Sequence, residues 1–361
     1  MAKPNVLLVD DHIPPPAVVE RLGASVELNV QLPQFVREED LEKANLVLVD
    51  WRLDDWLERD ALPTPSLRPR DGLALSSTLK SHLSSVTTAP VAFALWSAHL
   101  ADLVVELPPV PHNIARQRGV EWAFSKTQDA DEQANQVTSL ALAVMALPRR
   151  WGVGAEFISL ATSRLLGIST ESWADRARIG VAGAFPPVHQ SAIDTRGIAF
   201  LRWLLHRVLP YPGFLWSAPR IAVRLGVRLD SFTAAVQPAR ALGKEFQPYR
   251  YNGLLSSFLG PRWWRAGIEQ HLWDATNGNS FDADMTAAWV RRKTRGQISQ
   301  IEEMDPVLWV DDRLEFQDAP VSRLTAVRVQ PDDWPSYAEP AWARQEDVER
   351  DAMLRALTVS T

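Results

Sequence analysis

The chain has 361 residues and no cysteine, which excludes disulfide bonds and thiolate chemistry. Its apolar fraction of 46% allows large hydrophobic cores, and its length suggests two or three domains. The longest apolar runs fall well short of the roughly 18 to 20 residues that span a bilayer, and the N-terminus lacks a signal-peptide pattern. We therefore expect a cytoplasmic protein that does not bind membranes.

The net charge of −6 conceals three segments of opposite sign. Residues 1–147 carry 12 Lys or Arg against 20 Asp or Glu, residues 149–265 carry 16 against 6, and residues 266–361 carry 10 against 18. The basic middle segment could bind a polyanion, or it could form ion pairs with the acidic flanks of the same chain. Composition leaves both interpretations open.

Strands and helices alternate through residues 1–147. The strand candidates are short apolar or β-branched runs bounded by polar residues, Pro or Gly, at 6–9, 26–30, 46–49, 91–95 and 120–124. Helical patterns lie between and after them, at 16–22, 36–43, 71–83 and 131–147. This order predicts an α/β fold with a doubly wound, five-stranded parallel sheet of the flavodoxin-like kind. Such sheets bind ligands at the carboxyl ends of their strands.

The sequence LPRRWG at residues 147–152 follows the last of these helices and indicates a domain boundary. We expect one domain at 1–147 and a second at 148–361, with a sub-boundary near residue 265. The second domain holds 11 of the 15 tryptophans and has mostly α-helical patterns between Gly and Pro breaks.

The residues that follow the predicted strands share one chemistry. Asp10 and Asp11 follow the first strand and Asp50 follows the third, while Ser97 follows the fourth and Lys126 the fifth. Because the carboxyl ends of parallel strands meet at one edge, we expect these groups to lie together. Three carboxylates make a hard oxygen site for Mg²⁺, and a carboxylate can accept a phosphoryl group whose charge Mg²⁺ and Lys neutralise.

In this order, the acidic pair, the DWRL sequence around Asp50, Gly72, the dipeptide Ser97–Ala98 and Lys126 resemble the receiver domain of two-component response regulators. The resemblance covers residues 4–147. It implies a signalling protein in which phosphorylation of the receiver controls a C-terminal output region.

The same resemblance implies a role for each residue. Asp50 is the phosphoryl acceptor, and Asp10 and Asp11 bind Mg²⁺ together with Asp50 and the backbone carbonyl of Arg52. Ser97 and Lys126 contact the bound phosphoryl group. The implied partner is a sensor histidine kinase or another phospho-donor.

The sequence departs from the receiver pattern at four places. Asp54 and Thr127 stand where prolines are usual, and Ala123 stands where an aromatic residue is expected. The loop at 51–71 is also longer than usual, and this insert could gate phospho-donors or bind a protein partner. The departures keep open a second hypothesis, a degenerate receiver that serves as a protein-interaction scaffold without phosphotransfer.

The basic middle segment contains a helix-turn-helix pattern at 217–240, in which Ala222, Gly226 and Phe232 have the expected spacing. Arg220, Arg224 and Arg228 would supply phosphate contacts to a nucleic acid. A similar spacing at 163–173 makes the pattern less specific, because helix–Gly–helix hairpins are also common packing units.

A third hypothesis is an enzyme of unrecognised type in the C-terminal half. The segment at 271–285 offers His271, Asp274, Asp282 and Asp284, which could form a metal site, but a solvated loop with an Asn-Gly turn explains the segment better. The chain has no phosphate-binding loop, nucleophile elbow, zinc-ligand spacing or dinucleotide-binding glycines. Enzymatic activity beyond receiver phosphotransfer is therefore not expected.

Overall fold

The computed structural model describes residues 2–56, 59–60, 68–87, 89–104, 110–149, 151, 154–187 and 195–359. The chain forms two compact units: the first comprises residues 1–165, 186–210 and 257–259, and the second comprises 166–185, 211–256 and 260–361. These bounds differ from those of the predicted domains 1–147 and 148–361. That domain division, with its sub-boundary near residue 265, stays a prediction.

The first unit is built on a five-stranded parallel sheet with the order β2-β1-β3-β4-β5. The strands are β1 (Asn5–Val9), β2 (Glu27–Gln31), β3 (Leu46–Asp50), β4 (Ala92–Ser97) and β5 (Trp122–Ser125). Every residue of β3 and β4 is buried, as in parallel sheets that are covered on both faces. The predicted α/β fold with a doubly wound, five-stranded sheet is confirmed.

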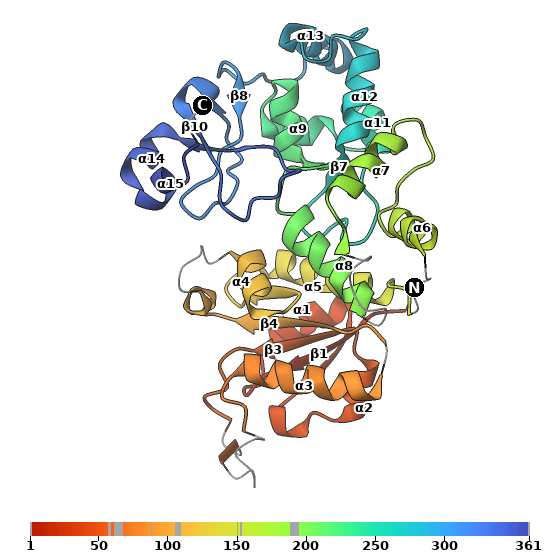
Figure 1. The fold of residues 1–361 in the computed structure, drawn as a ribbon, viewed down its shortest axis with the longest axis vertical. Helices are drawn as coiled ribbons and strands as arrows, with labels where there is room; N and C mark the ends of the chain where they lie inside the picture. Colours follow the sequence, from red (N-terminus) through yellow and green to blue (C-terminus); the bar gives the residue numbers. More distant parts are fainter. Residues whose placement is uncertain are drawn as a thin grey trace. The chain divides into compact units, whose positions relative to one another are not determined.

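Helices cover both faces of this sheet, with α2 and α3 on one side and α1 and α5 on the other (Figure 1). The helices are α1 (Pro16–Ser25), α2 (Glu38–Lys43), α3 (Gly72–Val86), α4 (Pro111–Arg118) and α5 (Ala130–Met145), with short 3₁₀ turns η1 (Pro33–Phe35) and η4 (Leu100–Leu103). The side chain of Asp71 caps α3 by accepting from the N–H groups of Leu73 and Ala74, and Asp129 caps α5 in the same way.

Helix α4 is absent from the elements predicted from sequence. Its two end signals are nevertheless present, because Pro111 begins the helix and Gly119 ends it with a left-handed φ of 65°. The helix was not predicted because its sequence, PHNIARQR, contains few apolar residues, although it buries Ile114 and Ala115.

Three later helices also belong to the first unit: α6 (Ala155–Leu165), α8 (Arg196–Trp203) and the π-helical turn η7 (Leu204–Val208). Helix α8 packs on α5, and η7 packs on α4. This part of the unit lies outside the predicted receiver range of 4–147, so the compact unit is larger than the receiver that the sequence predicts.

A buried carboxylate joins this later segment to the amino-terminal edge of the sheet. Glu121 is 1% exposed and accepts hydrogen bonds from the backbone N–H of Phe93 and from Arg202 Nε, the latter at 2.7 Å. Arg202 Nη2 also donates to the carbonyl of Gly119 at 2.9 Å. His206 Nε2 lies 2.8 Å from the carbonyl of Glu121, and burial lowers the pKa of His206 to about 4, so Nε2 is the donor of a neutral imidazole.

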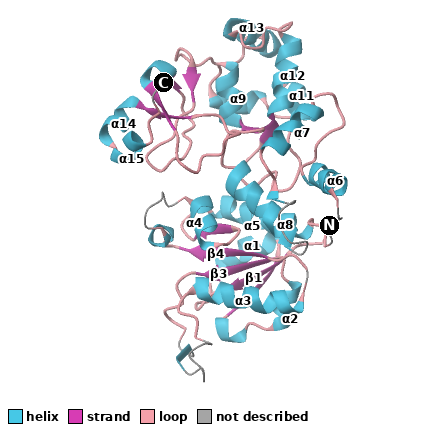
Figure 2. Ribbon diagram, in the orientation of Figure 1, coloured by secondary structure: helices cyan, strands magenta, loops and turns pink. Residues whose placement is uncertain are grey.

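The second unit is mostly helical, with short two-stranded sheets between the helices (Figure 2). Its elements are α7 (Ala174–Gly183), β6 (Leu215–Ser217), α9 (Ala218–Leu225), α10 (Leu229–Ala235), α11 (Ala241–Phe246), η8 (Gln247–Tyr249), β7 (Arg262–Trp264), α12 (Arg265–Ala275), α13 (Ala283–Thr294), β8 (Pro306–Val307), β9 (Val321–Ser322), η9 (Arg323–Thr325), β10 (Ala326–Val329), β11 (Ala341–Arg344), α14 (Gln345–Arg350) and α15 (Ala352–Ala356). Trp216, Phe232 and Trp263 lie in its main hydrophobic cluster. The predicted mostly helical C-terminal region is confirmed.

In the part of the chain that the structure describes, no helix is both long and apolar enough to cross a membrane.

Candidate functional site

The carboxyl ends of four strands meet at one edge of the sheet and carry the predicted residues. Asp10 and Asp11 directly follow β1, Asp50 ends β3, Ser97 ends β4, and Lys126 directly follows β5. A pocket of about 270 Å³ opens at this edge. Its lining consists of Asp11, His12, Asp50, Arg52, Asp54, Asp55, Ser97, Ala98, His99 and Lys126.

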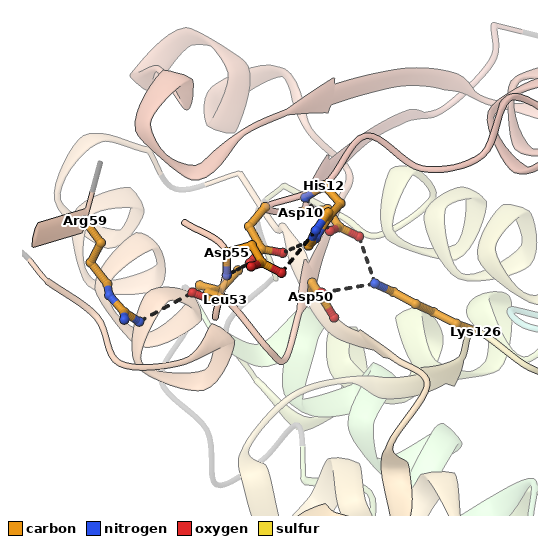
Figure 3. A network of polar contacts seen from close by, with 8 residues as sticks. Asp10, His12, Asp50, Leu53, Asp55, Arg59 and Lys126 are labelled. Carbon is orange, nitrogen blue, oxygen red and sulfur yellow. Dashed lines mark hydrogen bonds and ion pairs between the residues drawn. The ribbon is translucent and has the colours of Figure 1, made fainter. Parts of the chain in front are cut away.

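Lys126 forms ion pairs with two of these acidic residues. Its Nζ lies 2.9 Å from Oδ2 of Asp10 and 3.0 Å from Oδ2 of Asp50, as the dashed lines in Figure 3 show. The carboxylate of Asp10 also accepts the backbone N–H of His12 at 3.0 Å. One ammonium group therefore joins the ends of two strands that lie side by side in the sheet.

Burial disfavours the ionised form of Asp50. The residue is 7% exposed, and burial, followed by the nearby charge of Asp10, raises the pKa of Asp50 to about 6 despite the opposing effect of Lys126. Burial by itself lowers the pKa of Lys126, but its contacts with Asp10 and Asp50 outweigh burial and raise that pKa. Lys126 thus supplies a single positive charge to two buried carboxylates.

A second network, which the sequence did not predict, lies beside the first. Asp11 accepts the backbone N–H of Asp55 at 2.8 Å, and its Oδ1 lies 3.1 Å from Nδ1 of His12. The opposite nitrogen of His12, Nε2, lies 3.1 Å from Asp55 Oδ2 (Figure 3). The hydrogen bond with Asp11 raises the pKa of His12. The acidic pair is therefore tied to the loop that follows Asp50.

Gly72 is required at its position by a close approach. Its N–H donates to the carbonyl of Trp51 at 2.9 Å, and a Cβ at Gly72 would lie 1.8 Å from the backbone oxygen of Asp50. Only a residue without a side chain lets α3 begin this close to the end of β3.

Ser97 is 1% exposed, and its hydroxyl accepts the N–H of His99 at 3.0 Å.

Two of the three carboxylates predicted to hold Mg²⁺, Asp10 and Asp11, lie in a group of possible metal ligands, whose third member is His12 and not Asp50. Asp10, Asp11 and His12 each offer one ligand atom, and these atoms all lie within 4.8 Å of one another. Carboxylate oxygens are the ligands that Mg²⁺ prefers, and the negative charge that Lys126 leaves uncompensated favours a cation. The side chain of Arg52 does not contact the acidic pair and instead forms an ion pair with Asp102, with Nη2 at 2.8 Å from Oδ2. The role of the Arg52 carbonyl stays a prediction.

The insert at 51–71 falls partly on residues 57–58 and 61–67, which lie outside the described residues. Of its described part, Arg59 Nη1 donates to the carbonyls of Leu53 at 3.4 Å and Arg70 at 3.2 Å. The predicted partner site on this insert stays a prediction.

The three arginines predicted to contact nucleic acid all have partners within the second unit. Arg220 forms an ion pair with Glu339, Arg224 donates to the carbonyl of Ser280, and Arg228 lies 3.2 Å from Asp230. Helices α9 and α10 flank Gly226, which has a left-handed φ of 67°, and they pack on each other. This arrangement fits both a helix-turn-helix and an ordinary helix–Gly–helix hairpin. The contact with nucleic acid stays a prediction.

The acidic segment at 271–285 plays structural roles. His271 packs against Phe246 and Trp289, and Asp282 caps α13 by accepting the N–H of Met285 at 3.0 Å. Among the residues that the structure describes, this segment supplies no group of side chains arranged to hold a metal ion.

Comparison with known proteins leaves the family open. No protein-family model matches the chain, and no curated protein matches it. A solved structure of the RcsB response regulator of Salmonella typhimurium is similar over 65% of this chain and 88% of that chain, with 13% identity and a TM-score of 0.26. A likeness at this level does not establish membership of a family.

Proposed function

We propose that the chain is a response-regulator-like signalling protein whose first unit accepts a phosphoryl group at Asp50, with Mg²⁺ as the cofactor. The observation that carries the proposal is the placement of Lys126 Nζ within 3.0 Å of Asp50 and 2.9 Å of Asp10, at the edge where the strands end. A buried nucleophile, a paired cation and an acidic metal site together are the parts that phosphoryl transfer requires.

In this mechanism an ionised oxygen of Asp50 attacks the phosphorus of a phosphohistidine or an acyl phosphate. The new O–P bond forms as the donor's P–N or P–O bond breaks, and the bonding electron pair leaves with the donor group. Lys126 holds positive charge beside the transferring group, and the buried Ser97 hydroxyl can donate to one of its oxygens. Bound Mg²⁺, held by Asp10, Asp11, Asp50 and the carbonyl of Arg52, would neutralise charge on the phosphoryl oxygens.

The test is intact mass after incubation with acetyl phosphate and Mg²⁺. We expect one added phosphoryl group in the wild type and none in Asp50→Asn. Asp312→Asn is the matched control, because Asp312 also lies in an acidic pair after an apolar run but is exposed and belongs to the second unit. A wild-type mass that neither acetyl phosphate nor beryllofluoride changes would contradict phosphoryl acceptance.

A receiver-like scaffold without phosphotransfer is the second candidate. Ala123 favours it, because this residue is buried with 1% exposure where the resemblance to receivers expects an aromatic side chain. Phosphorylation of Asp50 in the mass experiment would reject the scaffold, whereas an unmodified protein would support it.

A further inference from the structure

The second unit contains a pocket of about 300 Å³ that the phosphoryl-acceptor proposal does not involve. It lies between helices α9 and α12 and the later segment at 306–342. Its lining consists of Pro212, Arg220, Arg265, Pro306, Val307, Leu308, Phe316, Arg323, Glu339, Pro340 and Trp342. We call this site the arginine pocket. Its volume lies at the lower end of the range for small-molecule sites.

Aromatic rings hold the three guanidinium groups of the pocket in place. The guanidinium carbons of Arg220 and Arg265 lie 5.2 and 5.4 Å from the centre of the Trp216 ring. Arg323 lies 5.2 Å from the centre of the Trp342 ring. Cation–π contacts of this kind fix the arginines before a ligand arrives, which lowers the entropy cost of binding.

Three of the lining side chains are arginines, and each has a carboxylate partner. Arg220 Nε forms a close ion pair with Glu339, which also lines the pocket. Arg265 Nε lies 2.8 Å from Glu269, and Arg323 Nε lies 2.8 Å from Asp305. A guanidinium group has five N–H donors, so one carboxylate does not use them all, and the remaining donors can bind a further carboxylate or phosphate in bidentate geometry.

The remaining walls of the pocket are apolar. Val307, Leu308, Phe316 and Trp342 line it together with three prolines. An inorganic anion would leave these walls without a partner, and a neutral apolar molecule would use none of the guanidinium donors that the ion pairs leave over. The lining therefore selects a ligand that carries both features.

We propose that the arginine pocket binds a small organic anion, with a carboxylate or phosphate group on an apolar body about the size of one ring. The anionic group contacts Arg220, Arg265 and Arg323, and the apolar body contacts Leu308 and Phe316. Because the pocket is built from two separate stretches of the second unit, a bound ligand joins them and stabilises the folded unit.

The test is titration calorimetry on the full chain with phenyl phosphate and benzoate as probes. Inorganic phosphate supplies the anion without the apolar body, and benzyl alcohol supplies the apolar body without the anion. We expect both organic anions to bind at least tenfold more tightly than either partial probe. If neither organic anion binds, or if inorganic phosphate binds as tightly, the proposal is wrong.

The variant Arg323→Gln separates binding from folding, because this side chain is 50% exposed and its loss leaves the core intact. We expect its affinity for the organic anions to fall at least tenfold while its melting temperature without ligand stays close to that of the wild type. Arg313→Gln is the matched control, since Arg313 is exposed in the same segment but does not line the pocket. Equal affinity in Arg323→Gln and Arg313→Gln would overturn the assignment. Neither result depends on phosphorylation of Asp50.

Discussion

Two buried carboxylates lie at opposite edges of the same sheet, and they have very different surroundings. Glu121, before β5, accepts from the N–H of Phe93 and pairs with Arg202, so its charge has dedicated partners. Asp50, at the end of β3, has 7% exposure and shares a single Lys126 with Asp10. The charge of the first carboxylate is compensated by groups that serve it alone, whereas the second shares its one cationic partner with another carboxylate.

This contrast separates a structural charge from the charge that we propose to be functional. Removing either partner of a buried, hydrogen-bonded ion pair strongly lowers the free energy of unfolding, because the other partner is left buried and unpaired. A buried carboxylate whose pKa is raised destabilises the fold when it ionises. The two residues should therefore respond to substitution in opposite directions.

Removing the satisfied carboxylate should have the largest effect. We expect Glu121→Ala to lower the free energy of unfolding by about 2–4 kcal/mol, because it leaves Arg202 and the N–H of Phe93 without their acceptor. Urea denaturation at pH 7 measures the change, with the exposed Glu42→Ala as the control. A loss of less than 1 kcal/mol would mean that Glu121 is not a structural charge.

Gly72→Ala should disturb Asp50 through the backbone. A Cβ at this position would overlap the carbonyl oxygen of Asp50, so we expect a loss of about 1–3 kcal/mol, typical of overpacking. Gly23→Ala is the control, because no atom lies within 4 Å of a Cβ there. Equal stability of the two variants would show that β3 and α3 can separate without cost.

Removing the charge of Asp50 should stabilise the protein at neutral pH. The pKa of Asp50 in the folded chain, about 6, exceeds the ordinary value of 3.8, so its contribution to stability is full below that ordinary value and is lost as the pH rises through 6. The full shift, which already includes the attraction of Lys126, corresponds to about 3 kcal/mol. Solvent screening through the open pocket reduces the expected gain to about 1–2 kcal/mol.

Unfolding free energies of Asp50→Asn and the wild type, compared from pH 4 to pH 8, measure this gain. The difference should grow across the window from pH 4 to pH 6 and level off above it. A variant that is less stable than the wild type at pH 7 would show that the pairing with Lys126 outweighs the cost of burial.

Magnesium should produce the smallest change. If Mg²⁺ binds with a dissociation constant near 1 mM, then 10 mM Mg²⁺ adds about 1.4 kcal/mol of stability and raises the melting temperature by a few degrees. The increase should disappear in Asp11→Ala. A melting temperature that is indifferent to Mg²⁺ in the wild type would argue against a divalent cation at this edge.

The residues at the carboxyl edge were predictable because they follow from chain order alone. Apolar runs locate β1, β3, β4 and β5, and each run is followed by a residue that parallel pairing brings to the same edge. The structure places Asp50 and Lys126 in contact across 76 positions of sequence for this reason. The network of Asp11, His12 and Asp55 depends on the conformation of a loop, for which the sequence carried no comparable pattern.

The partner of Glu121 could not be found in the same way. Arg202 is 81 positions away, in a helix that no motif connects to the sheet, and the basic middle segment offers many other arginines. The prediction that basic residues of this segment pair with the acidic flanks of the chain is met by Arg202 with Glu121 and by Arg220 with Glu339. Charge counts showed that pairs could form but not which residues would form them.

The division of the chain into interleaved segments has a consequence for modularity. The backbone passes from one unit to the other after residues 165, 185, 210, 256 and 259. A gene fusion or recombination event with a single breakpoint therefore cannot transfer the first unit alone. A breakpoint after residue 165 leaves behind residues 186–210 and 257–259, and a breakpoint after residue 259 carries along residues 166–185 and 211–256 of the second unit. An exchange of the first unit for another would therefore need several breakpoints, and it would also have to replace Arg202, which pairs with Glu121.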